Sequence, residues 1–320
     1  MHLNRGLLFW GLGFVTAGLV ALAIQFGYLE TALDGTWRLW PLILVALGIS
    51  LILSRTRLAL VGTALAAIIV GAGVGTAIAV GPGFASGCSD SPPAALQDQT
   101  GTLGTTASLD WRLDCGTLGV SMSQGSNWRA SLGSTGKDAP RVDGDSGHLD
   151  LKSANQGAGV FFGRERERWD VQLPSATTYQ AEIHINASKT TLDLTGARFS
   201  ALSLQPNATD VLMTLDGASV DGFDVTLNAG SLAMNASAST NLSGTIQANA
   251  GSVQLCAPPD TGLRITARGT AFSTNLGESD LNPIGDTWES ATYPQAAHRV
   301  TLTVRGNAAS FDLMPPGECQ

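Results

Sequence analysis

The sequence predicts a fold in two parts: three transmembrane α-helices at the N-terminus, followed by an all-β C-terminal domain that forms a right-handed-type β-solenoid with ~21-residue coils. Three observations support this fold class. The first part of the chain is apolar and almost uncharged, an Asn-Ala phrase returns at a fixed interval in the second part, and apolar residues alternate behind each phrase. Long apolar runs are typical of membrane spans, and a short repeat with two-residue alternation is typical of stacked strands.

The balance of charge changes near residue 81. Up to Val80 the chain carries four basic and two acidic residues, whereas the rest carries 14 basic and 24 acidic residues. An acidic domain repels nucleic acid and anionic lipid headgroups, so we expect neither as a partner of the second part. We therefore expect a transmembrane region at 1–80, a linker at 81–105 that is rich in Gly, Ser, Pro and Thr, and a β-solenoid domain at 106–320.

Three apolar stretches in the first part are predicted to cross the lipid bilayer, at about 6–28, 37–54 and 58–80. A spanning helix needs about 20 apolar residues, and aromatic side chains favour the membrane interface. The second stretch is short and reaches a usable length only if its first residues lie at the interface. A cleaved signal peptide ending near Ala23 is the alternative for the first stretch, but it leaves the two later stretches unexplained.

Basic residues determine the predicted orientation. Arg5 precedes the first stretch, and Arg55 and Arg57 lie in the turn between the second and the third. Because basic residues concentrate on the cytoplasmic side, the N-terminus and this turn are expected there. The sequence therefore predicts a multi-pass protein of the cell membrane with an extracytoplasmic β-domain.

The Asn-Ala phrase begins at Asn186, Asn207, Asn228 and Asn249, and a related phrase begins at Asn307. The first four are each 21 residues apart. Apolar residues, with Thr190 as the exception, stand four, six and eight positions after each Asn, which is the spacing of a strand with one buried face. Two interpretations of the Asn remain open. One is a row of ligands, and the other is a geometric role as a turn residue with positive φ or as an amide stack between coils. The strict period favours the geometric role.

The segments that flank the repeat predict irregular ends. Leu113–Val120 resembles the repeated phrase and is expected to open the β-domain, while the repeat decays after Thr261 into strands that cap the solenoid. The run Arg164–Arg168 alternates in charge, and we expect it to form a solvated edge or hairpin tip.

All four cysteines, Cys88, Cys115, Cys256 and Cys319, follow the apolar part of the chain. This distribution suits an oxidising compartment and up to two disulfides. Proximity in sequence suggests the pairs Cys88–Cys115 and Cys256–Cys319. Zinc is the competing use, but the chain has no Cys-x-x-Cys and its four His are scattered, so we expect no metal and no cofactor.

No catalytic motif is present in the sequence. It lacks Gly-x-Ser-x-Gly, His-Glu-x-x-His and a phosphate-binding loop. Asp143–Gly147 resembles the first half of a calcium loop, but the required Glu is missing, so a hairpin turn is expected there. We therefore predict that the protein is not an enzyme and has no catalytic, cofactor-binding or metal-binding residues.

Several segments resemble known bacterial families. Leu12-Gly13, Trp40–Leu44 and Leu47-Gly48 resemble the LiaI/LiaF-type transmembrane region. Trp169–Pro174 resembles the strand that toast-rack and putative-adhesin β-helical families place before their Gly-rich coils, and the stretch from Trp288 resembles their closing segment. These families include the C-terminal domain of LiaF from the cell-wall-antibiotic response.

The resemblance implies a non-enzymatic, membrane-anchored protein of the cell envelope that serves as a scaffold or accessory in envelope-stress sensing or signalling. It also implies a membrane sensor kinase or an envelope polymer as the partner. The alternative is a surface adhesin or structural envelope protein in which the helices act only as an anchor. The sequence leaves the oligomeric state open.

Overall fold

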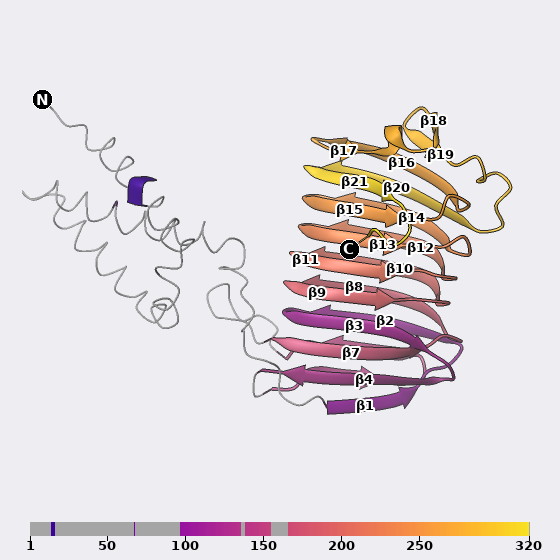
Figure 1. The fold of residues 1–320 in the computed structure, drawn as a ribbon. Coiled ribbons are helices and arrows are strands. Elements are labelled where there is room, and N and C mark those ends of the chain that lie inside the picture. The colour runs from indigo at the N-terminus through magenta and orange to yellow at the C-terminus, as the bar shows by residue number, and fades with distance from the viewer. Residues whose placement is uncertain (1–13, 17–66, 68–96, 136–137, 155–165, 320) are drawn as a thin grey trace, which may run out of the picture. The chain divides into compact units, whose positions relative to one another are not determined.

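Short strands separated by turns build two facing β-sheets (Figure 1). The computed structural model describes residues 14–16, 67, 97–135, 138–154 and 166–319. The chain divides into two units, Met1–Ser86 and Gly87–Gln320, and both sheets belong to the second.

The ten-stranded sheet has the spatial order β1 (Gln97–Thr102), β4 (Asn127–Ser134), β7 (Glu167–Pro174), β3 (Gly116–Ser123), β9 (Ser188–Asp193), β11 (Thr209–Thr214), β13 (Gly230–Asn235), β15 (Gly251–Cys256), β21 (Ala309–Met314) and β17 (Ser273–Thr274). The eleven-stranded sheet has the order β18 (Asn282–Ile284), β19 (Thr287–Glu289), β16 (Gly262–Thr270), β20 (Arg299–Asn307), β14 (Asn241–Ala248), β12 (Ser219–Leu227), β10 (Arg198–Asn207), β8 (Thr178–Asn186), β2 (Thr106–Leu113), β6 (His148–Lys152) and β5 (Arg141–Gly144). A short 3-10 helix, η2, spans Leu276–Glu278.

The predicted fold class is wrong in its helical part. In the described ranges, no helix is long and apolar enough to cross a membrane, and the secondary structure there is almost entirely β. The predicted spans at 6–28, 37–54 and 58–80 lie outside the described residues, apart from 14–16 and 67. The prediction rested on a count of apolar residues. Such a count measures how favourably a segment leaves water, and it does not establish that the segment forms one continuous helix.

The strands of the repeat lie where the sequence places them. β9, β11, β13 and β15 pair in parallel, and Val211 stands opposite Thr190 and Leu232, each 21 residues away. On the second sheet, Leu202 stands opposite Phe223. The inward side chains of both sheets form one buried core, because no single coil can bury its own apolar face.

The coils do not stack in chain order. The coil β2–β3 lies between β6–β7 and β8–β9, although it precedes them all in sequence. At the other end, β20–β21 lies between β14–β15 and β16–β17. Figure 1 shows both insertions as breaks in the colour order. Antiparallel strands close the stack at each end, where β4 pairs with β1 and β7, and β19 pairs with β16 and β18. The domain is therefore a parallel solenoid in its centre only.

Positive φ occurs beside the repeated Asn residues and not on them. Ala187 and Ala208, which directly follow Asn186 and Asn207, have φ of 43° and 50°. After Asn228 and Asn249 the positive φ falls one residue further on, at Gly230 with 115° and Gly251 with 130°. A Cβ added to Gly230 would lie 2.1 Å from the carbonyl oxygen of Thr209, so only glycine allows the two coils to approach this closely.

Candidate functional site

Seven charged residues and one histidine form two rows on the outer face of β5, β6, β2 and β8. We call this set the charge ladder. Its inward neighbours are apolar and buried, so alternation along each strand directs the charged side chains outward. The acid row consists of Asp143, Asp150, Asp110 and Glu182, and the base row consists of Arg141, Lys152, Arg112 and His184.

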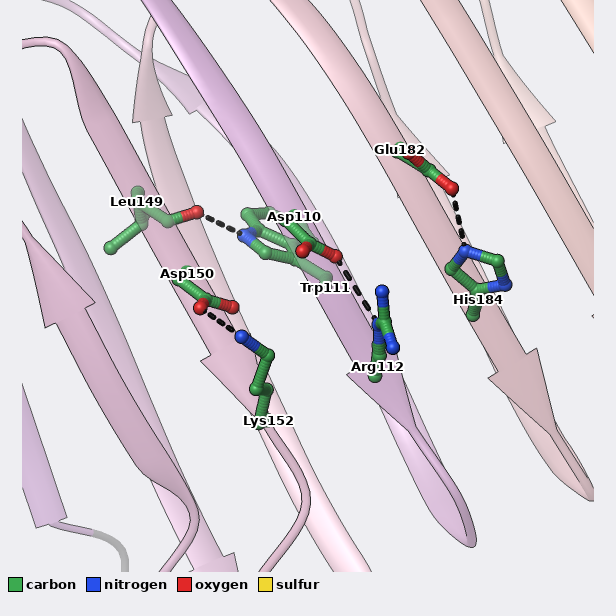
Figure 2. A network of polar contacts seen from close by, with 8 residues as sticks. All are labelled: Asp110, Trp111, Arg112, Leu149, Asp150, Lys152, Glu182 and His184. Carbon is green, nitrogen blue, oxygen red and sulfur yellow. Dashed lines mark hydrogen bonds and ion pairs between the residues drawn. The ribbon is translucent and has the colours of Figure 1, made fainter. Parts of the chain in front are cut away.

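Three strands of the charge ladder each carry an ion pair between residues two positions apart (Figure 2). Nε of Arg112 lies 3.5 Å from Oδ1 of Asp110, and Nε2 of His184 lies 2.8 Å from Oε1 of Glu182. The ammonium group of Lys152 contacts Oδ2 of Asp150. Each of β2, β6 and β8 therefore places a carboxylate next to a basic side chain.

Between strands, the charge ladder places like charges side by side. Asp110 stands directly opposite Asp150 on β6 and opposite Glu182 on β8. Like charges opposite one another on neighbouring strands destabilise a sheet. Oδ1 of Asp110 and Oδ1 of Asp150 are shielded from solvent, and neither accepts a hydrogen bond from the described part of the chain. The pairs within each strand offset this repulsion in part, and the remainder acts between the neighbouring carboxylates of the acid row.

Trp111 holds the ladder strands in register from the inner side. Its side chain is 1% exposed, and its indole Nε1 donates a hydrogen bond to the carbonyl oxygen of Leu149 at 3.2 Å. Figure 2 shows this bond crossing from β2 to β6 beneath the charged pairs. The bond fixes the alignment of the two strands and hence the alignment of the two rows.

The outer faces carry two shallow hollows. One, of about 480 Å³, lies at the β5–β6 end of the charge ladder and is lined by Arg141, Val142, Asp143, Asp150 and Lys152. The other, of about 420 Å³, lies on the ten-stranded sheet around Gly119, where a side chain is missing from the outer face. Its polar lining consists of Ser121, Arg129, Ser131, Asp170, Gln172, Thr191 and Asp193.

The repeated Asn residues form a hydrogen-bonded row, which we call the Asn ladder. Each side-chain amide donates to the side-chain oxygen of the preceding coil: Asn207 to Asn186 at 2.8 Å, Asn228 to Asn207, Asn249 to Asn228 at 2.7 Å, and Asn307 to Asn249 at 3.4 Å. The row ends on a carboxylate, because Asn186 donates to Oδ1 of Asp114 at 3.2 Å. This geometry is that of an amide stack between coils.

Glu167 is buried next to the end of the Asn ladder and was not expected there. It is 2% exposed, although the alternating charges around it predict a solvated edge. Its carboxylate accepts hydrogen bonds from Nε1 of Trp169 at 2.8 Å, from the backbone N–H of Ala154 at 2.9 Å and from Oγ of Ser153 at 3.2 Å. Burial raises the pKa of Glu167 to about 7, these three bonds oppose the rise, and the charge of Asp114 adds to it.

One disulfide joins the C-terminal tail to the outer face of the ten-stranded sheet. Cys256 and Cys319 are bonded, with their Cα atoms 5.8 Å apart, and this is the pair suggested by proximity in sequence. Together with Ala233, they form a small apolar cluster separate from the main core. Cys115 is also disulfide-bonded, while Cys88 lies outside the described residues.

The calcium-like segment forms a hairpin turn between β5 and β6. The backbone N–H of Asp145 donates to the carbonyl oxygen of His148 at 2.9 Å, and Oδ1 of Asp145 accepts from the N–H of Gly147 at 2.7 Å. Among the described residues, no group of three or more His, Cys, Asp or Glu is placed to hold a metal ion.

The sequence analysis did not predict the charge ladder, although the sequence contains a pattern that corresponds to it. An acidic residue, one apolar residue and a basic residue follow one another at Asp110–Arg112, Asp150–Lys152 and Glu182–His184. Each triplet alone is common in half-buried strands. Only the pairing of β6, β2 and β8 shows that the three triplets lie side by side.

Comparisons with known proteins agree with the resemblance found in the sequence. Residues 8–52 match the family model of the LiaI-LiaF-like transmembrane region, and residues 103–235 match that of the N-terminal domain of toast_rack. The first match supports association with a membrane. The second covers the stack from the residues before β2 to the end of β13. No curated protein sequence matches the chain.

Two solved structures are similar to the chain. One is described as a putative cell adhesion protein from Clostridium sporogenes, with 12% identity and a TM-score of 0.43, and the similarity covers 68% of this chain and 98% of that one. The other is described as a putative adhesin from Bacteroides fragilis, with 11% identity and a TM-score of 0.25, and it covers 68% of this chain and 97% of that one.

Proposed function

Because the chain joins a LiaI-LiaF-like transmembrane region to a toast-rack N-terminal domain, we propose that it is a non-enzymatic, membrane-anchored protein of the cell envelope that assists envelope-stress sensing or signalling. The β-domain contacts other molecules through the outer faces of its sheets. The membrane region conveys that contact to a membrane sensor kinase, which is the proposed partner.

The observation that carries this proposal is the arrangement of the polar groups. The charge ladder spans four adjacent strands, and the Asn ladder runs from coil to coil. A site for a small substrate encloses its ligand, and a few polar groups point toward that ligand. Extended rows on an open sheet instead suit contact with a macromolecule, as a scaffold or accessory protein requires.

The proposed location of the β-domain is outside the cytoplasm, with the N-terminus inside. The Cys256–Cys319 disulfide supports this location, because such bonds persist in oxidising compartments. The basic residues Arg5, Arg55 and Arg57 support a cytoplasmic N-terminus. Labelling of intact cells with a membrane-impermeant maleimide tests the location. Labelling only after reduction is expected, whereas labelling only after cell lysis would place the domain in the cytoplasm.

Reconstitution tests the signalling role. The full chain and the sensor kinase of the same cell's envelope-stress system are placed together in liposomes, and kinase autophosphorylation is measured. We expect the rate to change by at least about fivefold when the chain is present, which corresponds to a modest coupling free energy. An unrelated membrane protein at equal density serves as the control.

The same preparation separates the alternative functions. If the kinase rate is unchanged and the full chain binds isolated cell-wall sacculi, the protein is an envelope-polymer binder or adhesin, and the signalling proposal is wrong. If the rate changes without sacculus binding, the direct partner is the kinase.

A further inference from the structure

The arrangement of charges in the charge ladder is not the one that most stabilises the sheet. Exchanging Asp110 and Arg112 alone would place opposite charges side by side across β6, β2 and β8. The exchange requires no change in composition or net charge. Sequences that keep an unfavourable local arrangement commonly do so at a site of function. The repulsion within each row therefore points to something outside the sheet that relieves it.

The spacing of the rows restricts what can face them. Neighbouring charges within a row are one strand apart, which is about 4.8 Å, and the two rows are two residues apart along each strand, which is about 6.6 Å. A complementary surface needs rows of opposite sign with the same two spacings. Another β-sheet has these spacings. The same face of a second copy of this chain already carries both rows at these spacings.

We propose that the charge ladder is the contact between two copies of this chain, which meet face to face across a two-fold axis parallel to the rows. Such an axis lies between the acid row and the base row and exchanges them. Arg112 of one copy then faces Asp110 of the other, and the reverse contact forms at the same time. A two-fold interface is self-complementary in this way.

The geometry is compatible with two anchored chains. A two-fold axis parallel to the rows leaves both stacks pointing in the same direction, so both chains enter the β-domain at the same end. The side chains of Asp110, Arg112 and Glu182 are 39%, 51% and 56% exposed, so this part of the charge ladder is open to a partner. Exposed ion pairs are weak and are screened by salt. The contact therefore depends on the high local concentration that anchoring in one membrane provides. This inference does not depend on the kinase proposed above.

The first test is the self-association of the wild-type chain. Full-length chains carrying donor or acceptor fluorophores at the N-terminus are reconstituted in liposomes, and energy transfer is measured against protein density. We expect association that weakens at least about tenfold between roughly 50 mM and roughly 500 mM salt. A chain that stays monomeric at low salt, or associates equally at both salt concentrations, contradicts the proposal.

Charge reversal gives the second test. One variant makes the face acidic (Arg112→Glu with Arg141→Glu), and the other makes it basic (Asp110→Lys with Asp143→Lys). Each variant alone should lose association by at least about tenfold, and an equal mixture of the two should restore it. A mixture that fails to associate, although both variants unfold cooperatively, would falsify the proposed pairing.

A matched control changes the same number of charges on the other sheet. Arg168 and Lys189 are exposed on the outer face of the ten-stranded sheet. Arg168→Glu with Lys189→Glu alters the net charge by as much as the acidic variant does, and it should leave energy transfer unchanged. An equal loss in this control would attribute the effect to net charge and overturn the assignment to the charge ladder.

The exchange variant Asp110→Arg with Arg112→Asp tests the row arrangement in a protein that is expected to fold. It should raise the melting temperature of the β-domain, because the charges that face one another across β6, β2 and β8 become opposite. It should not abolish self-association, because position 110 of one copy still faces position 112 of the other with the opposite charge. A variant that is no more stable than the wild type would show that the rows carry no repulsion, and would remove the premise of the proposed contact.

Discussion

Asn207 donates its side-chain amide to the side-chain oxygen of Asn186 at 2.8 Å, and the two residues are 21 positions apart. The same oxygen-to-amide contact recurs along the stack until it reaches the carboxylate of Asp114. Each interior amide therefore donates to one neighbour and accepts from the next, and hydrogen bonds in such chains strengthen one another. The Asn residues recur every 21 positions in the sequence because each one bonds to the Asn of the preceding coil.

Removing an interior member of the Asn ladder should break two hydrogen bonds. We expect Asn207→Ala to lower the free energy of unfolding by about 1 to 2 kcal/mol, because Asn186 loses a donor and Asn228 loses an acceptor. Chemical denaturation of the full chain in detergent measures the change. Asn307→Ala is the control, since Asn307 makes only the long terminal bond of 3.4 Å, and it should cost less than half as much. Equal costs would show that the row contributes no cooperative stability.

Glycine at position 230 should be far more sensitive than glycine at position 196. Gly230→Ala places a Cβ 2.1 Å from the carbonyl oxygen of Thr209 at a φ of 115°, so the coils must separate. We expect a loss of about 3 kcal/mol or more. Gly196→Ala has a positive φ of 69° but no atom within 4 Å of the new Cβ, and it should cost about 1 kcal/mol. Similar melting temperatures for the two variants would argue against close approach of the coils.

Glu167 should make the stability of the β-domain depend on pH. Its pKa is about 7 in the folded domain against 4.5 for a free glutamate side chain, so the folded state binds the proton more tightly. The stabilising contribution is full below pH 4.5 and is lost as the pH rises through 7. It amounts to about 3 kcal/mol.

The variant Glu167→Gln tests this pH dependence. It should remove the decline in stability between pH 4.5 and 7 while leaving the contribution of the other carboxyl groups in place. Urea unfolding of both proteins at a series of pH values measures the difference. Parallel curves for the two proteins would mean that Glu167 titrates as an exposed carboxyl does.

The Cys256–Cys319 disulfide should stabilise the β-domain chiefly by restricting the unfolded chain. The bond closes a loop between residues 63 positions apart, and loop-closure entropy for that length corresponds to about 4 kcal/mol. Replacing both cysteines by serine should lower the melting temperature, and a reducing agent should have a smaller effect on the variant than on the wild type. If reduction destabilises both proteins equally, the contribution comes from another disulfide.

Part of the candidate site could be predicted from the sequence, and the rest requires knowledge of which strands pair. The Asn ladder was predictable, because the Asn residues recur at one interval and the similar phrases at Asp114 and Asn307 mark its two ends. The charge ladder was not, because its triplets lie at irregular intervals in the chain. Glu167 was placed wrongly, since alternating charges in a sequence do not show which one is covered by a neighbouring segment.

The sequence by itself determined the period of the coils, the strands from Ser188 to Cys256 and the direction in which their side chains point. These features depend on contacts between neighbouring coils, and each coil there meets the next one in the chain. Only the tertiary structure decided the order of the coils at the two ends, where β2–β3 and β20–β21 are inserted between segments distant in sequence. The physical reason is that every coil presents similar backbone edges. The partner of an end coil is therefore chosen by the fit of side chains across the whole core, and local pattern does not contain that information.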